Sequence, residues 1–160
     1  MPARCPNIGG SNYHVAMATS PADRDDELLI AFTTVVNRSR ARLKPALEAM
    51  GITAPQADAL WMLDPADGIP TMKDLAGRLN CDPSTATFLV DRLAGQGLVE
   101  RVTSATDRRS KCVSLTGKGL KVRNDLMRSM SERSVLASLS ATDQVAVGRL
   151  LRKALAKADD

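Results

Sequence analysis

The chain has 160 residues and a formal net charge of +4 at pH 7. This length suits one domain with a buried core, and nothing in the sequence indicates a second domain. Because it has neither a signal-peptide pattern nor a run of about 18 apolar residues, we expect a cytoplasmic protein that is not inserted in a membrane.

The first residues differ from the rest of the chain. Residues 1–20 are rich in Gly, Pro, Ser and Asn and show no periodicity. Such composition at a terminus is typical of a disordered arm, which we place at residues 1–22. The remaining residues, 23–160, are expected to form a single domain.

A long amphipathic helix is predicted from Asp25 to Met50, within which Pro45 introduces a kink or an early end. Its apolar residues recur at helical intervals and are Leu28, Phe32, Val35, Val36, Leu43 and Leu47. A second helix is predicted to start at Thr53, where Gln56 completes a capping box. A turn cluster follows at residues 64–68.

Two short helices are predicted next. Thr71 and Asp74 have the spacing of a capping box, and Met72, Leu75, Ala76 and Leu79 then fall on one helix face. After a break at Asn80-Cys81, Asp82 and Pro83 supply a second N-cap with proline at the first helical position.

We call this second short helix the reader helix. Its predicted buried stripe consists of Ala86, Leu89, Val90 and Leu93. The stripe leaves Ser84, Thr85, Thr87, Phe88 and Asp91 pointing partly or wholly away from the core. The three hydroxyls can contact phosphates or base edges, and the helix N-terminus itself also favours phosphate. The alternative is that Ser84 and Thr85 simply support the cap.

A basic hairpin is predicted after the reader helix, which Gly95 and Gly97 are expected to end. Residues 98–102 have the β-branched pattern of a strand, a turn follows at 104–108, and residues 109–115 form the return strand. Thr116 then caps another helix. The hairpin is strongly positive because it carries Arg101, Arg108, Arg109 and Lys111, which outnumber acidic residues such as Asp107.

The last two predicted helices extend from Gly119 to about Leu136 and from a cap formed by Ser140 and Asp143. The final helix carries an apolar stripe of Val147, Leu150, Leu151, Ala154 and Leu155. So small a core cannot cover the stripes of both the first and last helices, which predicts an interface between two copies of the chain. The alternative is a monomer whose helices fold over its own core.

Five motifs in this order resemble the MarR (multiple antibiotic resistance regulator) family of winged helix-turn-helix transcription factors. They are Ser84-Thr85-Ala86-Thr87, Val90-Asp91-Arg92-Leu93, Gly97-Leu98-Val99-Glu100-Arg101, Asp107-Arg108-Arg109 and Leu115-Thr116-Gly117-Lys118-Gly119. The resemblance implies a mainly α fold with a small β-hairpin wing. Residues 53–118 would form the winged helix, and residues 23–50 and 119–158 the flanking dimerisation helices.

The resemblance also implies a function. The chain would be a sequence-specific DNA-binding regulator, acting as a homodimer on a pseudo-palindromic operator and most simply as a repressor. Arg109 would reach the minor groove, oriented by Asp107, and the alternative is a solvated charge; Arg108 would contact a phosphate or only solvent. The candidate DNA contacts are Ser84, Thr85, Thr87, Phe88, Arg101, Asp107, Arg108, Arg109 and Lys111.

Phe88 departs from the family pattern, which often has a polar residue there. Its ring either touches a thymine methyl or sugar or folds back under the helix, and we expect the second because aromatic area is usually buried.

A small aromatic or anionic effector, implied by the family, would find its candidate site at Arg38, Arg42 and Trp61. The alternative without an effector is that the tryptophan belongs to the core and the two arginines are solvated surface charges.

Other functional classes have less support. No Gly-rich phosphate loop, carboxylate pair or nucleophile with histidine indicates an enzyme, so we expect no catalytic residue and no cofactor. The cysteines, Cys5, Cys81 and Cys112, lack metal-ligand spacing, and the single histidine is His14.

Two alternatives remain. One is a winged helix that serves as a protein-interaction or dimerisation module, against which the basic wing argues. The other is a redox-sensing regulator in which oxidation of Cys81 disturbs DNA binding, whereas a buried or inert thiol is the more ordinary state.

Overall fold

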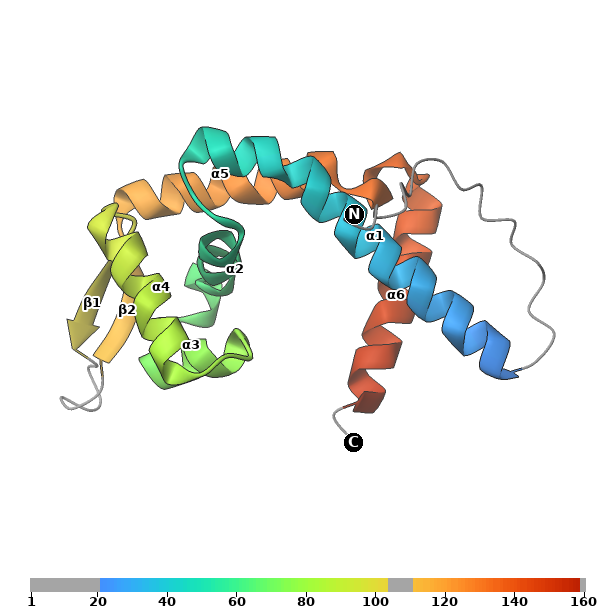
Figure 1. The fold of residues 1–160 in the computed structure, drawn as a ribbon, viewed down its shortest axis with the longest axis horizontal. Helices are drawn as coiled ribbons and strands as arrows, with labels where there is room; N and C mark the ends of the chain where they lie inside the picture. Colours follow the sequence, from blue (N-terminus) through green and yellow to red (C-terminus); the bar gives the residue numbers. More distant parts are fainter. Residues whose placement is uncertain (1–20, 104–110, 159–160) are drawn as a thin grey trace, which may run out of the picture. The chain divides into compact units, whose positions relative to one another are not determined.

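The computed structural model describes residues 21–103 and 111–158. The elements in chain order are α1 (Pro21–Met50), α2 (Ala54–Met62), the 3-10 turn η1 (Pro65–Asp67), α3 (Met72–Arg78), α4 (Pro83–Gly95), β1 (Val99–Thr103), β2 (Lys111–Leu115), α5 (Gly117–Arg133), the 3-10 turn η2 (Val135–Ser138) and α6 (Ala141–Ala158) (Figure 1). The predicted winged helix-turn-helix, mainly α with one small hairpin, is confirmed. Residues 1–20 of the predicted N-terminal arm lie outside the described residues, and the predicted boundary at residue 22 is wrong because α1 already begins at Pro21.

The chain divides into two compact units, residues 1–36 and residues 37–160. The described part of the first unit is the beginning of α1. The second unit contains the rest of α1 and all other elements. No helix of the described residues is long and apolar enough to span a lipid bilayer.

The core of the second unit lies among the end of α1, α2, α3, α4, the hairpin and α5. In it α4 packs on α2, α3 and β1, and α2 also packs on α5 (Figure 1). Burying a leucine or valine side chain contributes about 1.5–3 kcal/mol. The fully buried large residues are Leu60, Leu75, Val90, Leu93, Val113 and Leu126.

The predicted helix starts are confirmed by their hydrogen bonds. At α2 the Gln56 Oε1 atom accepts from the backbone N–H of Thr53 at 2.8 Å. At α3 the Asp74 N–H donates to the Thr71 hydroxyl at 3.1 Å, while the Asp74 carboxylate accepts from the Thr71 N–H. Thr116 caps α5 by accepting from the Gly119 N–H at 3.0 Å. These bonds satisfy N–H groups that would otherwise lack partners, which is why each helix begins where it does.

The two strands form an antiparallel hairpin in which Val99 pairs with Leu115 and Thr103 with Lys111. The segment before α3 adds to this sheet, because the Val113 N–H donates to the Pro70 carbonyl at 3.0 Å and Thr71 bridges to Cys112. The hairpin is therefore tied to the start of the helix-turn-helix and does not project from the core on its own.

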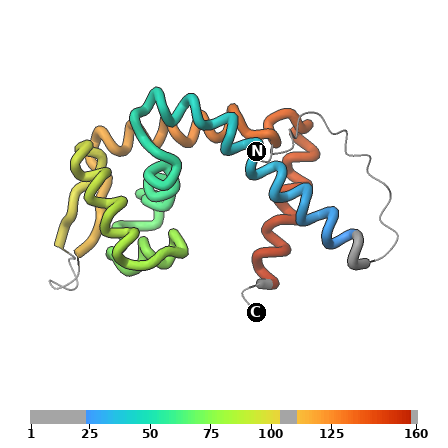
Figure 2. Tube along the Cα trace, in the orientation of Figure 1, coloured from blue at the N-terminus to red at the C-terminus, as the bar shows by residue number. Residues whose placement is uncertain are grey.

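Three sequence expectations need correction. Helix α1 runs without a break to its end (Figure 2). Because it extends to Met50 with Pro45 inside it, the predicted alternative of an early end at Pro45 is wrong. Gly95 is the last residue of α4, and of the two glycines only Gly97 is left-handed, with φ of 69°. The predicted helix to Leu136 ends at Arg133, because Ser134 leaves helical geometry and its hydroxyl accepts from the Leu136 N–H to start η2.

The apolar stripe predicted for the last helix is present on α6, which Ser140 and Asp143 cap as expected. Its leucines are exposed: Leu155 is 67% and Leu150 is 59% accessible. Within the first unit, Leu28 at 70% and Phe32 are also exposed on α1. Each of these helices thus presents apolar surface that the protein would have to cover in another way.

Candidate nucleic-acid interface

The first turn of α4 is organised around Asp82. Its carboxylate accepts from the N–H groups of Ser84 and Thr85, each at 3.0 Å. Both hydroxyls also donate to it, that of Thr85 at 2.7 Å. The Ser84 and Thr85 side chains therefore do support the cap, the more ordinary of the two predicted roles.

These bonds have an electrostatic consequence. The hydroxyls of Ser84 and Thr85, followed by their N–H groups, hold the pKa of Asp82 well below its usual range, so the carboxylate stays charged. A helix N-terminus favours an anion, but here the anion is Asp82 itself. In this structure the N–H groups of Ser84 and Thr85 donate to Asp82, and contact of this N-terminus with a phosphate stays a prediction.

The exposed face of α4 continues with Thr87 and Phe88. The Thr87 hydroxyl donates to the Pro83 carbonyl at 2.8 Å. Phe88 is 57% exposed, with the Arg92 guanidinium carbon 5.1 Å from the centre of its ring. The expectation that Phe88 folds back into the core is wrong, because the buried stripe of Ala86, Leu89, Val90 and Leu93 already fills the space beneath the helix.

The charged residues of the hairpin that were predicted to contact DNA differ in their contacts and exposure. Arg101 on β1 pairs with Asp91 of α4 at 2.8 Å, which ties the hairpin to the reader helix. Lys111 is exposed at the start of β2. The candidates Asp107, Arg108 and Arg109 lie outside the described residues.

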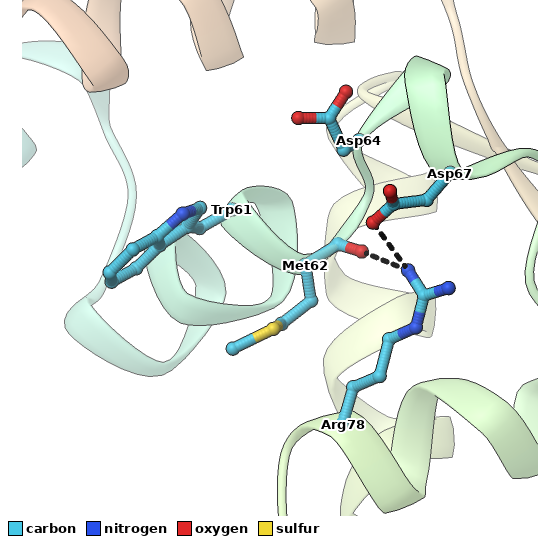
Figure 3. A pocket seen from close by; sticks show the side chains of 5 residues that line it. All are labelled: Trp61, Met62, Asp64, Asp67 and Arg78. Atoms are coloured by element: carbon cyan, nitrogen blue, oxygen red, sulfur yellow. Dashed lines mark hydrogen bonds and ion pairs between the residues drawn. The ribbon is translucent and has the colours of Figure 1, made fainter. Parts of the chain in front are cut away.

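Trp61, predicted as a core or effector-site residue, is 43% exposed and lines two cavities. One, of about 600 Å³, is also lined by Met62, Asp64, Asp67 and Arg78 (Figure 3). In it the Arg78 guanidinium donates to the Met62 carbonyl at 3.0 Å and lies 3.5 Å from the Asp67 carboxylate.

The second cavity, of about 480 Å³, lies among α2, α5, η2 and α6. Its lining is mainly apolar and includes Met127, Met130, Leu136 and Leu151. Arg38 and Arg42 are exposed and line neither of these two cavities, so the structure does not bring them together with Trp61 there.

Sequence reasoning missed an ion pair between a buried arginine of α5 and a partly exposed aspartate in the turn after α2. The Arg123 guanidinium donates to the Asp64 carboxylate at 2.6 Å, and the Arg123 side chain is only 9% exposed. The Ala66 N–H and Arg123 hold the pKa of Asp64 below its usual value, against the opposing effect of burial. The sequence did contain one indication of this ion pair, because Arg123 precedes the buried Leu126 by three residues and so falls on the apolar face of its helix.

The two described cysteines are unpaired. Cys81 is half-buried immediately before the cap residue Asp82, and Cys112 is buried in β2. Cys5 lies outside the described residues.

Comparison with known proteins agrees with this geometry. Residues 52–111 match the MarR family model. The organic hydroperoxide resistance transcriptional regulator of Bacillus subtilis (strain 168) is 38% identical over 76 residues, which are 48% of this chain and 51% of that protein. The chain thus spans about half the length of this relative.

Solved structures extend the likeness to more of the chain. A MarR family protein from Bacillus stearothermophilus is 28% identical with a TM-score of 0.66, over 87% of this chain and 95% of that one. A MepR mutant from S. aureus, bound to an oligodeoxyribonucleotide, is 23% identical with a TM-score of 0.55, over 81% and 96% of the two chains. The second likeness shows the shared fold.

Proposed function

We propose that the protein, whose residues 52–111 match the MarR family model, is a sequence-specific DNA-binding regulator of transcription. The observation that carries this proposal is α4. One side of this 13-residue helix is buried on the core, while the other side is exposed along Ser84, Thr87, Phe88 and Asp91. A helix held in this way can enter the major groove of DNA, which is wide enough for it.

Charge and fold support the same function. Residues 71–125, which contain the helix-turn-helix and the hairpin, have ten Lys and Arg residues against six Asp and Glu residues. A positive surface attracts the phosphate backbone and supplies the salt-dependent part of the affinity. The S. aureus MepR mutant has the same fold and was solved with an oligodeoxyribonucleotide, so this fold is compatible with DNA binding.

We further propose that the regulator is a homodimer, in which the apolar stripes of α1 and α6 are covered by a second copy. Leu150, Leu151 and Leu155 would supply apolar contacts of the kind that homodimer interfaces bury. Two-fold symmetry would place the two copies of α4 roughly 34–36 Å apart, one turn of DNA. Its operator would be pseudo-palindromic, and binding there would repress by blocking the promoter.

A small-molecule effector is the last part of this proposal. The mainly apolar cavity lined by Trp61, Met127 and Met130 has the volume and character to hold a small aromatic molecule. Its walls come from α2 of the winged helix and from α5, η2 and α6. A ligand there would favour one spacing of the two reader helices over another and so release the operator.

The test compares binding of the purified protein to its own upstream DNA and to an unrelated fragment across a salt series. The proposal expects the upstream fragment to bind tighter by a factor of about 10³ or more, with affinity that falls steeply as salt increases. Arg109→Ala should weaken upstream binding by about 1–3 kcal/mol. Equal, weak binding to both fragments would instead favour a winged helix that binds a protein partner.

A further inference from the structure

The reader helix presents an aromatic ring where a DNA-reading helix contacts base edges. At 100° per residue, Ser84 and Phe88 lie on the side of α4 opposite the buried stripe of Leu89, Val90 and Leu93. Phe88 is 57% exposed, and Arg92, one turn later, lies over its ring. An aryl ring can neither donate nor accept a conventional hydrogen bond, so any readout by Phe88 is apolar contact.

The polar groups before Phe88 have already used their hydrogens. Within residues 84–88, all of which the structure describes, the Ser84 and Thr85 hydroxyls donate to Asp82 and the Thr87 hydroxyl donates to the Pro83 carbonyl. The N–H groups of Ser84 and Thr85 donate to Asp82 as well. Because a hydroxyl has one hydrogen, each of these side chains retains only lone pairs that can accept.

This arrangement matches one base pair better than the other. In the major groove guanine presents only the acceptors N7 and O6, which these hydroxyls cannot satisfy and which the charged Asp82 repels. Adenine presents the N6 amino donor, and thymine presents a 5-methyl group. Cytosine also presents an amino donor, N4, so the accepting hydroxyls suit adenine or cytosine and disfavour guanine. The 5-methyl group that the ring can contact is presented by thymine alone, so it is the ring that favours an A·T pair.

We propose that Phe88 is a specificity-determining residue that recognises the 5-methyl group of a thymine in the operator, while the hydroxyls before it disfavour guanine. This inference rests on the proposed function and deepens it, because it assigns the chemistry by which α4 discriminates between sequences. Arg92 stacks on the ring and places a positive charge beside it, where a phosphate contact would hold the helix against the groove.

The experiment begins with selection of the preferred site of the wild-type protein from a pool of random duplex DNA. Each thymine of that site is then replaced singly by deoxyuridine, which removes only the 5-methyl group. Affinities are measured for the wild type, Phe88→Ala, Phe88→Leu and Arg92→Gln. Because Phe88 is exposed, its substitution should leave the fold intact, which circular dichroism checks.

At one thymine of each half-site the wild type should lose about fourfold in affinity, the value expected for one buried carbon of this size. Phe88→Ala should bind thymine and deoxyuridine duplexes equally at that position, whereas Phe88→Leu should keep part of the preference. Arg92→Gln retains the ring, so it should bind all duplexes more weakly and keep the full preference for the methyl group.

Two results would overturn the inference, and they differ in what else they remove. If the wild type selects a site but no thymine depends on Phe88, the readout by Phe88 is wrong and the regulator proposal stands. If the wild type selects no sequence at all, both the readout and the proposed function are wrong.

Discussion

The helices α4 and α6 both carry a regular apolar stripe, yet only one of them buries it. Leu89, Val90 and Leu93 of α4 are buried on the core of the winged helix, whereas Leu150 and Leu155 of α6 are more than half exposed. A stripe in a sequence shows that a helix packs on something, and it does not show on what. Helix α4 packs on a surface of its own chain, and under our proposal α6 packs on a second copy.

The largest effect expected on the winged-helix side of this comparison is that of Gly119→Ala. A Cβ at Gly119 would overlap the carbonyl oxygen of Leu98, a backbone atom that cannot move away without disturbing the hairpin. We expect a loss of about 4 kcal/mol in the free energy of unfolding, or failure to fold. Urea denaturation measures it.

Gly117→Ala is the matched control, because a Cβ there meets nothing within 4 Å. This variant should be close to neutral, within about 1 kcal/mol of the wild type. Similar stabilities for the two variants would contradict the close approach of α5 to Leu98.

A pair of leucines tests the comparison itself. Leu126 is fully buried in the second unit and Leu155 is 67% exposed on α6. Leu126→Ala should cost about 3 kcal/mol of stability at any protein concentration, since it leaves a cavity in the core. Leu155→Ala should instead weaken self-association by about tenfold, as expected for one interface leucine. Sedimentation equilibrium and urea denaturation at several concentrations separate these effects.

If Leu155→Ala left both self-association and stability unchanged, α6 would not be covered by a second copy. If it destabilised the protein as much as Leu126→Ala at every concentration, α6 would be covered by its own chain.

The cap of α4 should make stability depend on acid. The pKa of Asp82 is lowered in the folded protein, so its contribution is complete above the unfolded value of about 4 and is lost as pH falls below it. Asparagine also caps helices but does not titrate there. The Tm of Asp82→Asn should therefore fall less than that of the wild type between about pH 6 and about pH 3.

Asp64 and Asp74 also have lowered pKa values, so some acid sensitivity should persist in the Asp82→Asn variant. Equal loss of Tm in the variant and the wild type would show that the Asp82 cap is absent in solution.

The smallest effect is expected from the ion pair between α4 and β1. Both partners are substantially exposed, so Arg101→Gln should change stability by less than about 1 kcal/mol. Asp91→Asn removes a negative charge from the exposed face of α4, which should raise DNA affinity a few-fold at low salt. Unfolding curves and binding isotherms of the two variants provide the check, and lower DNA affinity of Asp91→Asn would contradict this orientation of α4.

Much of the winged helix could be predicted from sequence because its determinants are local. Capping residues such as Thr71 with Asp74 lie three positions apart, and the buried stripe of α4 follows from its helical period. What could not be predicted depended on distant partners. Whether Phe88 is buried depends on the space beneath α4, and the Arg123–Asp64 pair joins residues 59 positions apart.

The candidate interface divides in the same way. Sequence placed Ser84, Thr85 and Thr87 on the reader helix, but their hydrogen-bond partners and the exposure of Phe88 required the structure. The predicted grouping of Arg38 and Arg42 with Trp61 came from residue type alone, without a spacing rule to support it.

Under our proposal, two copies of α4, joined by the flanking helices, bind DNA together. The most direct test is the sequence pattern that the wild-type protein selects from random duplex DNA. We expect an inverted repeat whose half-site centres lie about 10–10.5 base pairs apart. A single unrepeated half-site would contradict the dimer, and an unselected pool would contradict DNA reading by α4.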